Sequence, residues 1–248
     1  MKRARICLRG CRLASRLCNI RDMCGRYAMA ADYDRLRKKF PLFADQYWDE
    51  FFDIHGYSAR PEIFPGTKIL ALNGHYHPEY VHWTIRAETW NGKIANAINA
   101  KAETIQKVQM FRDAFRTDRV LIPATSLFEW QEQPDGSKKK FRIWFDEPIF
   151  TFAGIARTCT IKGEEIRCTA IITTRPNETF ALIHNTKQRQ AVVIREEDHE
   201  KWLDPATKPD MLNQLMEPLS AESTHFEEAS AERGKDNGLF DANDGSGN

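Results

Sequence analysis

A cysteine near the start of the chain follows a methionine and opens the run Met23-Cys24-Gly25-Arg26-Tyr27. If synthesis starts at Met23, or cleavage falls after it, Cys24 becomes an N-terminal residue with an amine and a thiol two carbons apart. Such a pair condenses with aldehydes. The amine, with an ordinary pKa of about 7.7–8.0, is partly neutral at physiological pH. The thiol, near pKa ~8.5, needs only a modest depression to present thiolate. The alternative role is that of a small buried hydrophobe, as for many isolated cysteines.

Polar residues stand in apolar surroundings at three further places. Asn99 lies in a polar run behind Asn96, Glu129 ends an apolar strand between two aromatic residues, and His184 follows an apolar helix. A carboxylate flanked by Phe128 and Trp130 is partly desolvated, which raises its pKa toward acid–base use. Together these residue types predict a site for proton transfer.

Each of these residues also has a structural alternative. Glu129 fits a solvated position on an alternating strand, because carboxylates are usually exposed. His184 fits the C-terminal end of a helix over residues 177–185, where cations are favoured. Asn99 fits a turn. The sequence leaves these alternatives open for each residue taken alone.

The composition describes an ordinary globular chain of 248 residues, with 42% hydrophobic and 29% charged residues. No run of eighteen apolar residues exists, so the sequence predicts no membrane span. Residues 1–22 hold seven Lys or Arg and one acid, which is +6 of the formal net charge of +1, so the remainder carries −5. Any nucleic-acid surface on that remainder must be a local patch.

Residues 1–22 form a basic leader that we expect to be absent from the mature protein, with translation starting at Met23. An Arg-rich, acid-poor leader also fits a mitochondrial presequence, and it lacks the apolar region of a secretory signal. Three of the six cysteines lie in the leader. The other three, Cys24, Cys159 and Cys168, form no zinc spacing and are odd in number, which favours a reducing compartment without disulfides.

Strands outnumber helices and do not alternate with them, which predicts a mainly antiparallel α+β domain over residues 23–217. Asp32 is the predicted N-cap of a first helix, and Pro134-Asp135-Gly136 predicts a tight hairpin turn. Residues 41–66 read as irregular, and residues 218–248 as an acidic, disordered tail. The predicted helices are 32–40, 110–117, 177–185, 196–203 and 208–216, and the predicted strands are 68–72, 80–85, 119–127, 141–145, 149–155, 166–174 and 190–195.

Taken together, the polar motifs resemble the SOS response-associated peptidase (SRAP) family from Met23 to about Leu203. They fall in family order and roughly at family spacing. The motifs are Met23-Cys24-Gly25-Arg26-Tyr27, Asn99-Ala100-Lys101-Ala102-Glu103-Thr104, Phe111-Arg112-Asp113-Ala114-Phe115, Arg119-Val120-Leu121-Ile122-Pro123, Phe128-Glu129-Trp130 and Ile183-His184.

The resemblance implies a single α+β domain with curved sheets, a barrel-like core, peripheral helices and a basic cleft for single-stranded DNA. It implies covalent attachment to abasic sites through Cys24, in a DNA damage response, with autopeptidase and lyase activity and no cofactor. The implied partner is abasic single-stranded DNA, and the implied state is a cytoplasmic, nucleoid-associated monomer. The implied catalytic residues are Cys24, Asn99, Glu129 and His184, and the implied DNA-binding residues are Arg26, Lys101, Trp83, Trp130 and Arg189.

The segment after His184 departs from the family pattern, which usually places a short Arg-x-Pro there. This chain has a longer stretch without proline, so the basic role passes to Lys187 or Arg189. Two other functional classes remain: an N-terminal-nucleophile cysteine peptidase or amidohydrolase, and a non-catalytic module that binds single-stranded DNA. A free Cys24 amine is required by the covalent reactions and not by the binding module.

Two clusters have competing interpretations. His75-Tyr76-His77 could suggest a metal site, but the neighbouring Asn73-Gly74 favours an exposed hairpin tip, and we predict no metal. The basic run Lys138-Lys139-Lys140 could contact DNA phosphates. It fits a solvated hairpin edge that blocks strand pairing at least as well.

Overall fold

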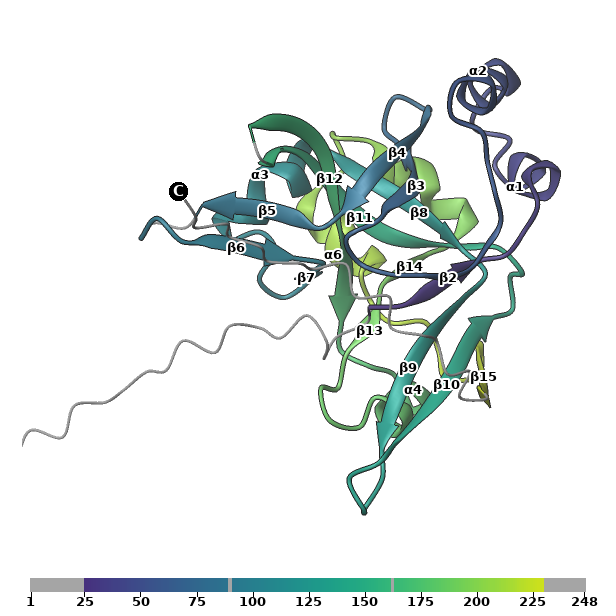
Figure 1. Ribbon diagram of the computed structural model, residues 1–248, viewed down its shortest axis with the longest axis vertical. Helices are drawn as coiled ribbons and strands as arrows, with labels where there is room; N and C mark the ends of the chain where they lie inside the picture. Colours follow the sequence, from purple (N-terminus) through teal and green to yellow (C-terminus); the bar gives the residue numbers. More distant parts are fainter. Residues whose placement is uncertain (1–24, 89–90, 162, 230–248) are drawn as a thin grey trace, which may run out of the picture.

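The computed structural model describes residues 25–88, 91–161 and 163–229, which form a mixed α+β domain, as predicted (Figure 1). The helices in these residues are α1 Tyr33–Lys39, α2 Asp45–His55, α3 Gln109–Thr117, α4 Glu178–Ile183, α5 His199–Leu203 and α6 Pro209–Leu215. The strands are β1 Tyr27–Met29, β2 Arg60–Ile63, β3 Lys68–Asn73, β4 Pro78–Trp83, β5 Ile85–Glu88, β6 Ile94–Ala97, β7 Asn99–Lys101, β8 Arg119–Ala124, β9 Ser126–Glu132, β10 Lys138–Phe145, β11 Phe150–Ile161, β12 Glu164–Thr174, β13 Gln190–Ala191, β14 Val193–Ile194 and β15 Thr224–Glu228.

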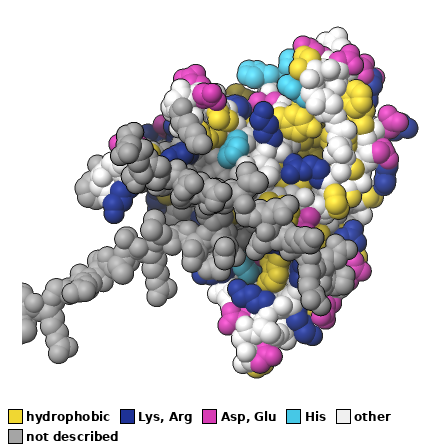
Figure 2. Space-filling view, viewed as in Figure 1, with side chains coloured by type: hydrophobic (Ala, Val, Ile, Leu, Met, Phe, Trp, Pro, Cys, Tyr) yellow, Lys and Arg dark blue, Asp and Glu magenta, His cyan; other side chains and the backbone are white. Residues whose placement is uncertain are grey.

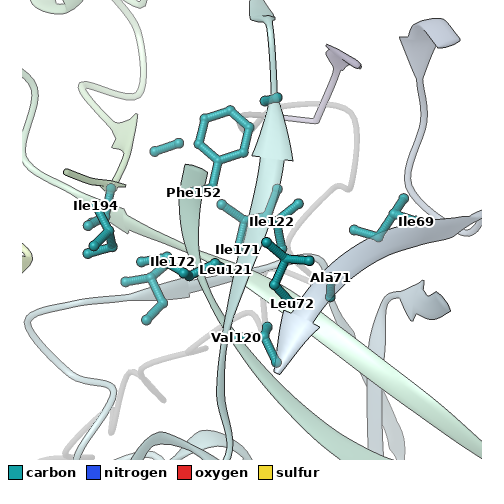
Figure 3. Packing of buried hydrophobic residues seen from close by; sticks show 14 of the residues in the cluster. Ile69, Ala71, Leu72, Val120, Leu121, Ile122, Phe152, Ile171, Ile172 and Ile194 are labelled. Atoms are coloured by element: carbon teal, nitrogen blue, oxygen red, sulfur yellow. The ribbon is translucent and has the colours of Figure 1, made fainter. Parts of the chain in front are cut away.

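Five strands close into a barrel in the order β12-β4-β3-β8-β11, because β11 pairs with both β8 and β12. The neighbours are antiparallel, except that β4 and β12 run parallel for two residue pairs. Buried aliphatic side chains from β3, β8 and β12 meet Phe152 of β11 in the core (Figure 3). The barrel-like core implied by the resemblance is therefore present.

Gly154 on β11 permits a close approach inside the barrel. A Cβ atom at this position would lie 2.8 Å from Ile122 Cδ1 and 2.8 Å from Val120 Cγ2, both on the paired strand β8. Real Cβ atoms do not approach other atoms so closely. The branched side chains of β8 thus fill the space that a larger residue at position 154 would need.

A second sheet, in the order β15-β10-β9-β1-β2, carries the predicted hairpin. Strands β9 and β10 extend away from the barrel at the bottom of Figure 1. In their turn, Gly136 has a φ of 80°, and the Asp135 carboxylate accepts a hydrogen bond of 2.9 Å from the Ser137 amide. The hairpin prediction is confirmed at the residues that suggested it.

The predicted irregular segment 41–66 was wrong in two places. It contains α2, which buries Trp48 and Phe51, and β2, which pairs with β1. Helix α2 begins after Ala44, which provides no side-chain cap, so the usual sequence signal for a helix start is missing. Asp32 does cap α1 as predicted, since its carboxylate accepts from the Arg35 amide at 2.8 Å.

The predicted disordered tail was also wrong for its first residues, because β15 lies within it and pairs along β10. The acidic residues of β15 meet basic partners there: Glu227 bonds to Arg142 at 3.1 Å and Glu228 to Lys139 at 3.4 Å. Strand β10 consequently has a neighbour on each side over Phe141–Phe145. Within the described residues Lys138 and Lys139 pair only with β9 and are exposed, which fits the hairpin edge that we expected for the basic run.

Arg119, the first residue of the motif Arg119-Val120-Leu121-Ile122-Pro123, has a structural role. Its side chain is 2% exposed and donates to the carbonyl oxygens of Phe115 at 2.6 Å and Trp202 at 2.6 Å, and also to that of Asp204. These carbonyls lie in α3 and at the end of α5, where helices leave oxygens without helical partners. One guanidinium thus fastens two helices to the start of β8.

The His75-Tyr76-His77 run lies at the turn between β3 and β4, as the hairpin alternative predicted. Tyr76 has a φ of 62°, and the Asn73 side chain accepts from the His75 amide at 2.9 Å. Among the described residues no group of three His, Cys, Asp or Glu is arranged to hold a metal ion. In the same residues, no helix is long and apolar enough to cross a membrane.

His199, at the start of α5, is a buried imidazole held in its neutral form. The Thr151 hydroxyl donates to the Ile194 carbonyl at 3.1 Å, so it accepts from His199 Nε2 at 3.0 Å. Burial lowers the pKa of His199 from 6.5 to about 4, against the partly opposing charge of Glu196. Protonation of this residue therefore opposes folding.

The stability of the protein should fall as pH drops from about 6.5 to about 4, because the unfolded chain binds the His199 proton more readily. This group should contribute a loss of about 3 kcal/mol. Denaturant titrations at several pH values between about 6.5 and about 4 measure this loss in the free energy of unfolding. His199→Gln, whose amide can still donate to Thr151, should flatten the curve, whereas the control His75→Gln, at an exposed position, should not. Parallel curves for the His199 variant and the parent would contradict the assignment.

Candidate active site

The described chain begins beside Glu129. Strand β1 pairs with β9, with Tyr27 opposite Leu127, and the Phe128 amide continues this ladder by donating to the Arg26 carbonyl at 2.9 Å. Continued by one more residue, this register would bring Gly25 opposite Glu129. Cys24, the predicted nucleophile, lies outside the described residues and immediately precedes Gly25 in the sequence.

Glu129 and His184, far apart in the sequence, are brought together in the fold. Glu129 is 2% exposed on β9, His184 is 4% exposed at the C-terminal end of α4, and His184 Nδ1 lies 3.9 Å from Glu129 Oε2. The Arg189 carbonyl lies 2.8 Å from His184 Nδ1 and can only accept, so Nδ1 carries a proton. In the neutral imidazole Nε2 is then the free base. A buried carboxylate beside a histidine of fixed tautomer is suited to proton transfer.

Hydrogen bonds from the next residues hold the His184 segment against β9. The Asn185 side chain accepts from the Glu132 amide at 3.0 Å and donates to the Glu132 carbonyl at 2.9 Å. Gln131 Nε2 donates to the Leu182 carbonyl at 2.8 Å. Neither Asn185 nor Gln131 was predicted from the sequence, because amide side chains in such positions carry no signal of a partner about fifty residues away.

Asn99 is 6% exposed at the start of β7, which runs parallel to β12 with Asn99 opposite Ile171. The preceding carbonyl, of Ile98, accepts from the Ile171 amide at 3.0 Å and from Trp83 Nε1 at 2.9 Å. The Trp83 hydrogen bond thus holds in place the backbone carbonyl of Ile98, the residue before Asn99.

The prediction that Trp83 lines a DNA-binding cleft was wrong. Its side chain is 1% exposed and packs edge-on against Tyr27 in the core, so a base cannot stack on it. The signal for burial was present in the sequence, since Val81, Trp83 and Ile85 alternate as the inward-facing residues of a strand do.

Lys101 and Arg189, both predicted to contact DNA, differ in their surroundings. Lys101 is exposed at the end of β7. Arg189 is half-buried and pairs with Glu103, with guanidinium–carboxylate distances of 2.7 and 2.9 Å, and it also donates to the Thr173 carbonyl. The Arg189 hydrogen bond holds the pKa of the Glu103 carboxyl below its usual value. A phosphate could reach this guanidinium only if it left Glu103.

Arg26 and Trp130, both expected to contact DNA, are neighbours. The Arg26 guanidinium carbon lies 4.9 Å from the centre of the Trp130 ring and 4.6 Å from that of Phe64, and Arg26 also pairs with Glu62 at 3.3 Å. Trp130 follows Glu129 directly, so the two side chains point to opposite faces of β9. The cation and the ring therefore lie across the sheet from the buried carboxylate.

Comparison with known proteins gives a family match over most of the chain. The sequence model of the family described as SOS response associated peptidase (SRAP) matches residues 23–235. Abasic site processing protein YoqW of Bacillus subtilis is 30% identical over 209 residues, covering 81% of this chain and 89% of the relative. Abasic site processing protein YedK of Escherichia coli is 29% identical over 188 residues, covering 73% and 79%.

Solved structures share the fold. A protein from Bacteroides thetaiotaomicron superposes with a TM-score of 0.70 at 23% identity, covering 82% of this chain and 90% of that one. A protein from Bordetella bronchiseptica gives a TM-score of 0.67 at 18% identity, covering 83% and 99%. At these identities the likeness concerns the fold alone.

Replacing Trp83 by Phe should lower the free energy of unfolding by about 2 kcal/mol, because the variant loses a buried hydrogen bond and leaves a small cavity. Hydrogen exchange at the Ile171 amide, which shares the Ile98 carbonyl, should become faster. Trp144→Phe, at a half-buried position, is the control and should change stability by less than about 0.5 kcal/mol. Equal stability of the Trp83 variant and the parent would refute the structural role.

Proposed function

Because the chain belongs to the SOS response associated peptidase (SRAP) family, we propose that it acts on abasic sites in DNA and bonds to them through Cys24. Its relatives bear the name abasic site processing protein. The observation that carries the proposal is the buried pair of Glu129 and His184, 3.9 Å apart, beside the start of the described chain. Consecutive Cα atoms are about 3.8 Å apart, so Cys24 lies one such step from Gly25, the first residue that the structure describes.

The proposed reaction uses the amine and the thiol of one residue. After removal of the preceding residues, the Cys24 amine adds to the aldehyde carbon of a ring-opened abasic sugar, and loss of water gives a Schiff base. The thiolate then adds to the same carbon and closes a five-membered thiazolidine, with the proton remaining on nitrogen. The second step is intramolecular and gains from high effective molarity.

Glu129 and His184 supply the proton transfers that these steps require. Water leaves the first adduct only when its hydroxyl receives a proton, and the amine must lose one. In this scheme the buried Glu129 carboxyl donates a proton to the sugar hydroxyl oxygen that leaves as water. The Nε2 atom of His184 accepts the proton from the amine, because Nδ1 keeps its own proton in the hydrogen bond to the Arg189 carbonyl. Asn99, also buried, positions the sugar.

DNA binding is assigned to Arg26, Lys101 and Trp130. The first two supply positive charge for phosphates, and the half-buried Trp130 supplies a surface for a base. Figure 2 shows acidic and basic side chains interspersed over one face, so this face is not uniformly basic. We place this activity on single strands in the cytoplasm, at the nucleoid, in a monomer.

Two further activities belong to the same proposal. Exposure of the Cys24 amine requires cleavage of the bond after Met23, which the site would perform as an autopeptidase. The Schiff base also acidifies the neighbouring sugar carbon, so β-elimination provides a lyase reaction. An amidohydrolase would share the free Cys24 amine but act on amides, and a simple binding module would not need Cys24.

Incubation with single-stranded DNA that contains an abasic site should give a heat-resistant crosslinked species on a denaturing gel. Its intact mass should equal protein from Cys24 plus DNA minus one water. Cys24→Ala should abolish the thiazolidine, whereas the matched control Cys159→Ala, at a buried cysteine, should retain it. Equal crosslinking of borohydride-reduced abasic DNA, which has no aldehyde, would exclude the proposed chemistry.

Glu129→Gln should fold and bind abasic DNA but crosslink at least ten-fold more slowly, since acid–base assistance is typically worth about 10²–10⁴-fold. Reversal of a preformed crosslink should slow as well, because both directions share one transition state. The rate is measured by quenched time points, and the melting temperature verifies folding. Glu132→Gln, at an exposed position of the same strand, is the control. A rate within about two-fold of the parent would remove Glu129 from the mechanism.

A further inference from the structure

One carboxylate holds two cations on the face of the second sheet that also carries Trp130. Glu62 Oε1 lies 3.3 Å from Arg26 Nη1 and 2.9 Å from Lys140 Nζ. The three side chains come from near the end of β2, from the residue before β1, and from β10, so this contact forms only when the sheet is assembled. All are partly accessible, with side-chain exposures of 27% for Glu62, 39% for Arg26 and 19% for Lys140.

The same two cations lie over aromatic rings. Lys140 Nζ is 4.2 Å from the centre of the Phe128 ring and 5.9 Å from that of Trp130. The Arg26 guanidinium carbon lies over Trp130 and Phe64, at 4.9 and 4.6 Å. We call this set the cation–aromatic cluster: Arg26, Lys140, Phe64, Phe128 and Trp130.

The cluster contains the two kinds of group that bind a single nucleic-acid strand, cations and aromatic rings, but both are already engaged within the protein. Nucleotides present phosphates for cations and ring faces for aromatic side chains. Here the Glu62 carboxylate takes the place that a phosphate would have between Arg26 and Lys140. A base reaches the face of Trp130 only when a cation moves off it.

We propose that Glu62 competes with DNA phosphates for Arg26 and Lys140, which makes Lys140 a phosphate ligand and Glu62 the residue that limits affinity for single strands. The inference rests on the proposed DNA-binding function and adds two residues to it. A phosphate presents two non-bridging oxygens where Glu62 uses one, so it can bind both cations together. Transfer of the cations to phosphate then frees the ring of Trp130 for a base.

The test is the affinity of Glu62→Gln for a fluorescent oligothymidylate of about 15 nucleotides that has no abasic site. Glu228→Gln is the matched control, because it removes the same charge from a carboxylate that pairs with Lys139 of the same strand, away from the cluster. Glu62→Gln should bind several-fold more tightly than the parent. Its plot of log affinity against log salt should steepen by about 0.7, the value for one more phosphate contact.

The affinity of Lys140→Gln for the same oligonucleotide tests the role of Lys140 independently, and Lys139→Gln is its control. Loss of Lys140 should weaken binding and make the salt dependence shallower by about 0.7. In the double variant, Glu62→Gln should improve binding less than it does in the parent, because one of the two released cations is missing. The Lys139 variant should keep the parent's affinity within about two-fold.

Two results would overturn the inference. One is equal affinity of Glu62→Gln and Glu228→Gln, which would show that only the change in net charge affects binding. The other is an affinity of Lys140→Gln equal to that of the parent. If neither the parent nor Glu62→Gln binds the oligonucleotide at low salt, the proposed DNA-binding function fails together with the inference. Loss of covalent crosslinking alone leaves this test intact, because the probe has no aldehyde.

Discussion

Closure of the barrel depends on β12, which exchanges partners along both of its edges. One edge pairs with β11 and then β13, and the other pairs with β4 and then β7. At the second exchange only two residue pairs join β4 to β12, and Trp83 bridges the gap by donating to the Ile98 carbonyl. The same exchange delivers Asn99 on β7, while β13 follows directly on the Arg189 carbonyl that orients His184. The polar site is thus built where the barrel changes strands.

Strand β9 separates two kinds of chemistry. Successive residues point to opposite faces of a strand, so the buried Glu129 and the half-buried Trp130 occupy different environments although they are adjacent in sequence. The buried side keeps a carboxylate and an imidazole away from water, where electrostatic interactions are stronger. The accessible side keeps cations over rings, with the cations partly exposed to solvent. The first described residues of the chain run beside this strand and adjoin both environments.

The elements that the sequence predicted well are those specified locally. The Asp32 cap, the hairpin at Asp135-Gly136 and most barrel strands follow from capping, turn chemistry and alternation. The family resemblance implied one site for Glu129 and His184, which local patterns could not do, and the fold places the two side chains 3.9 Å apart.

Features that depend on distant partners could not be predicted. Helix α2 has no side-chain cap to mark its start, and β15 looks disordered by composition until Lys139 and Arg142 neutralise its carboxylates. The Glu62 contacts join residues 36 and 78 positions apart. For Trp83 the resemblance suggested a cleft, but the side chain is buried in the core, and the alternation with Val81 and Ile85 that marks such a position was not used in the prediction.

Gly154 has an evolutionary consequence. A methyl group at this position would collide with both Val120 and Ile122 on the neighbouring strand, so a lineage can acquire alanine there only after one or both of these residues have become smaller. The converse also holds, since shrinking Val120 or Ile122 first opens a void that a new side chain at position 154 can fill. The three positions are therefore expected to covary among descendants of this sequence, each substitution altering which changes at the other two are tolerated.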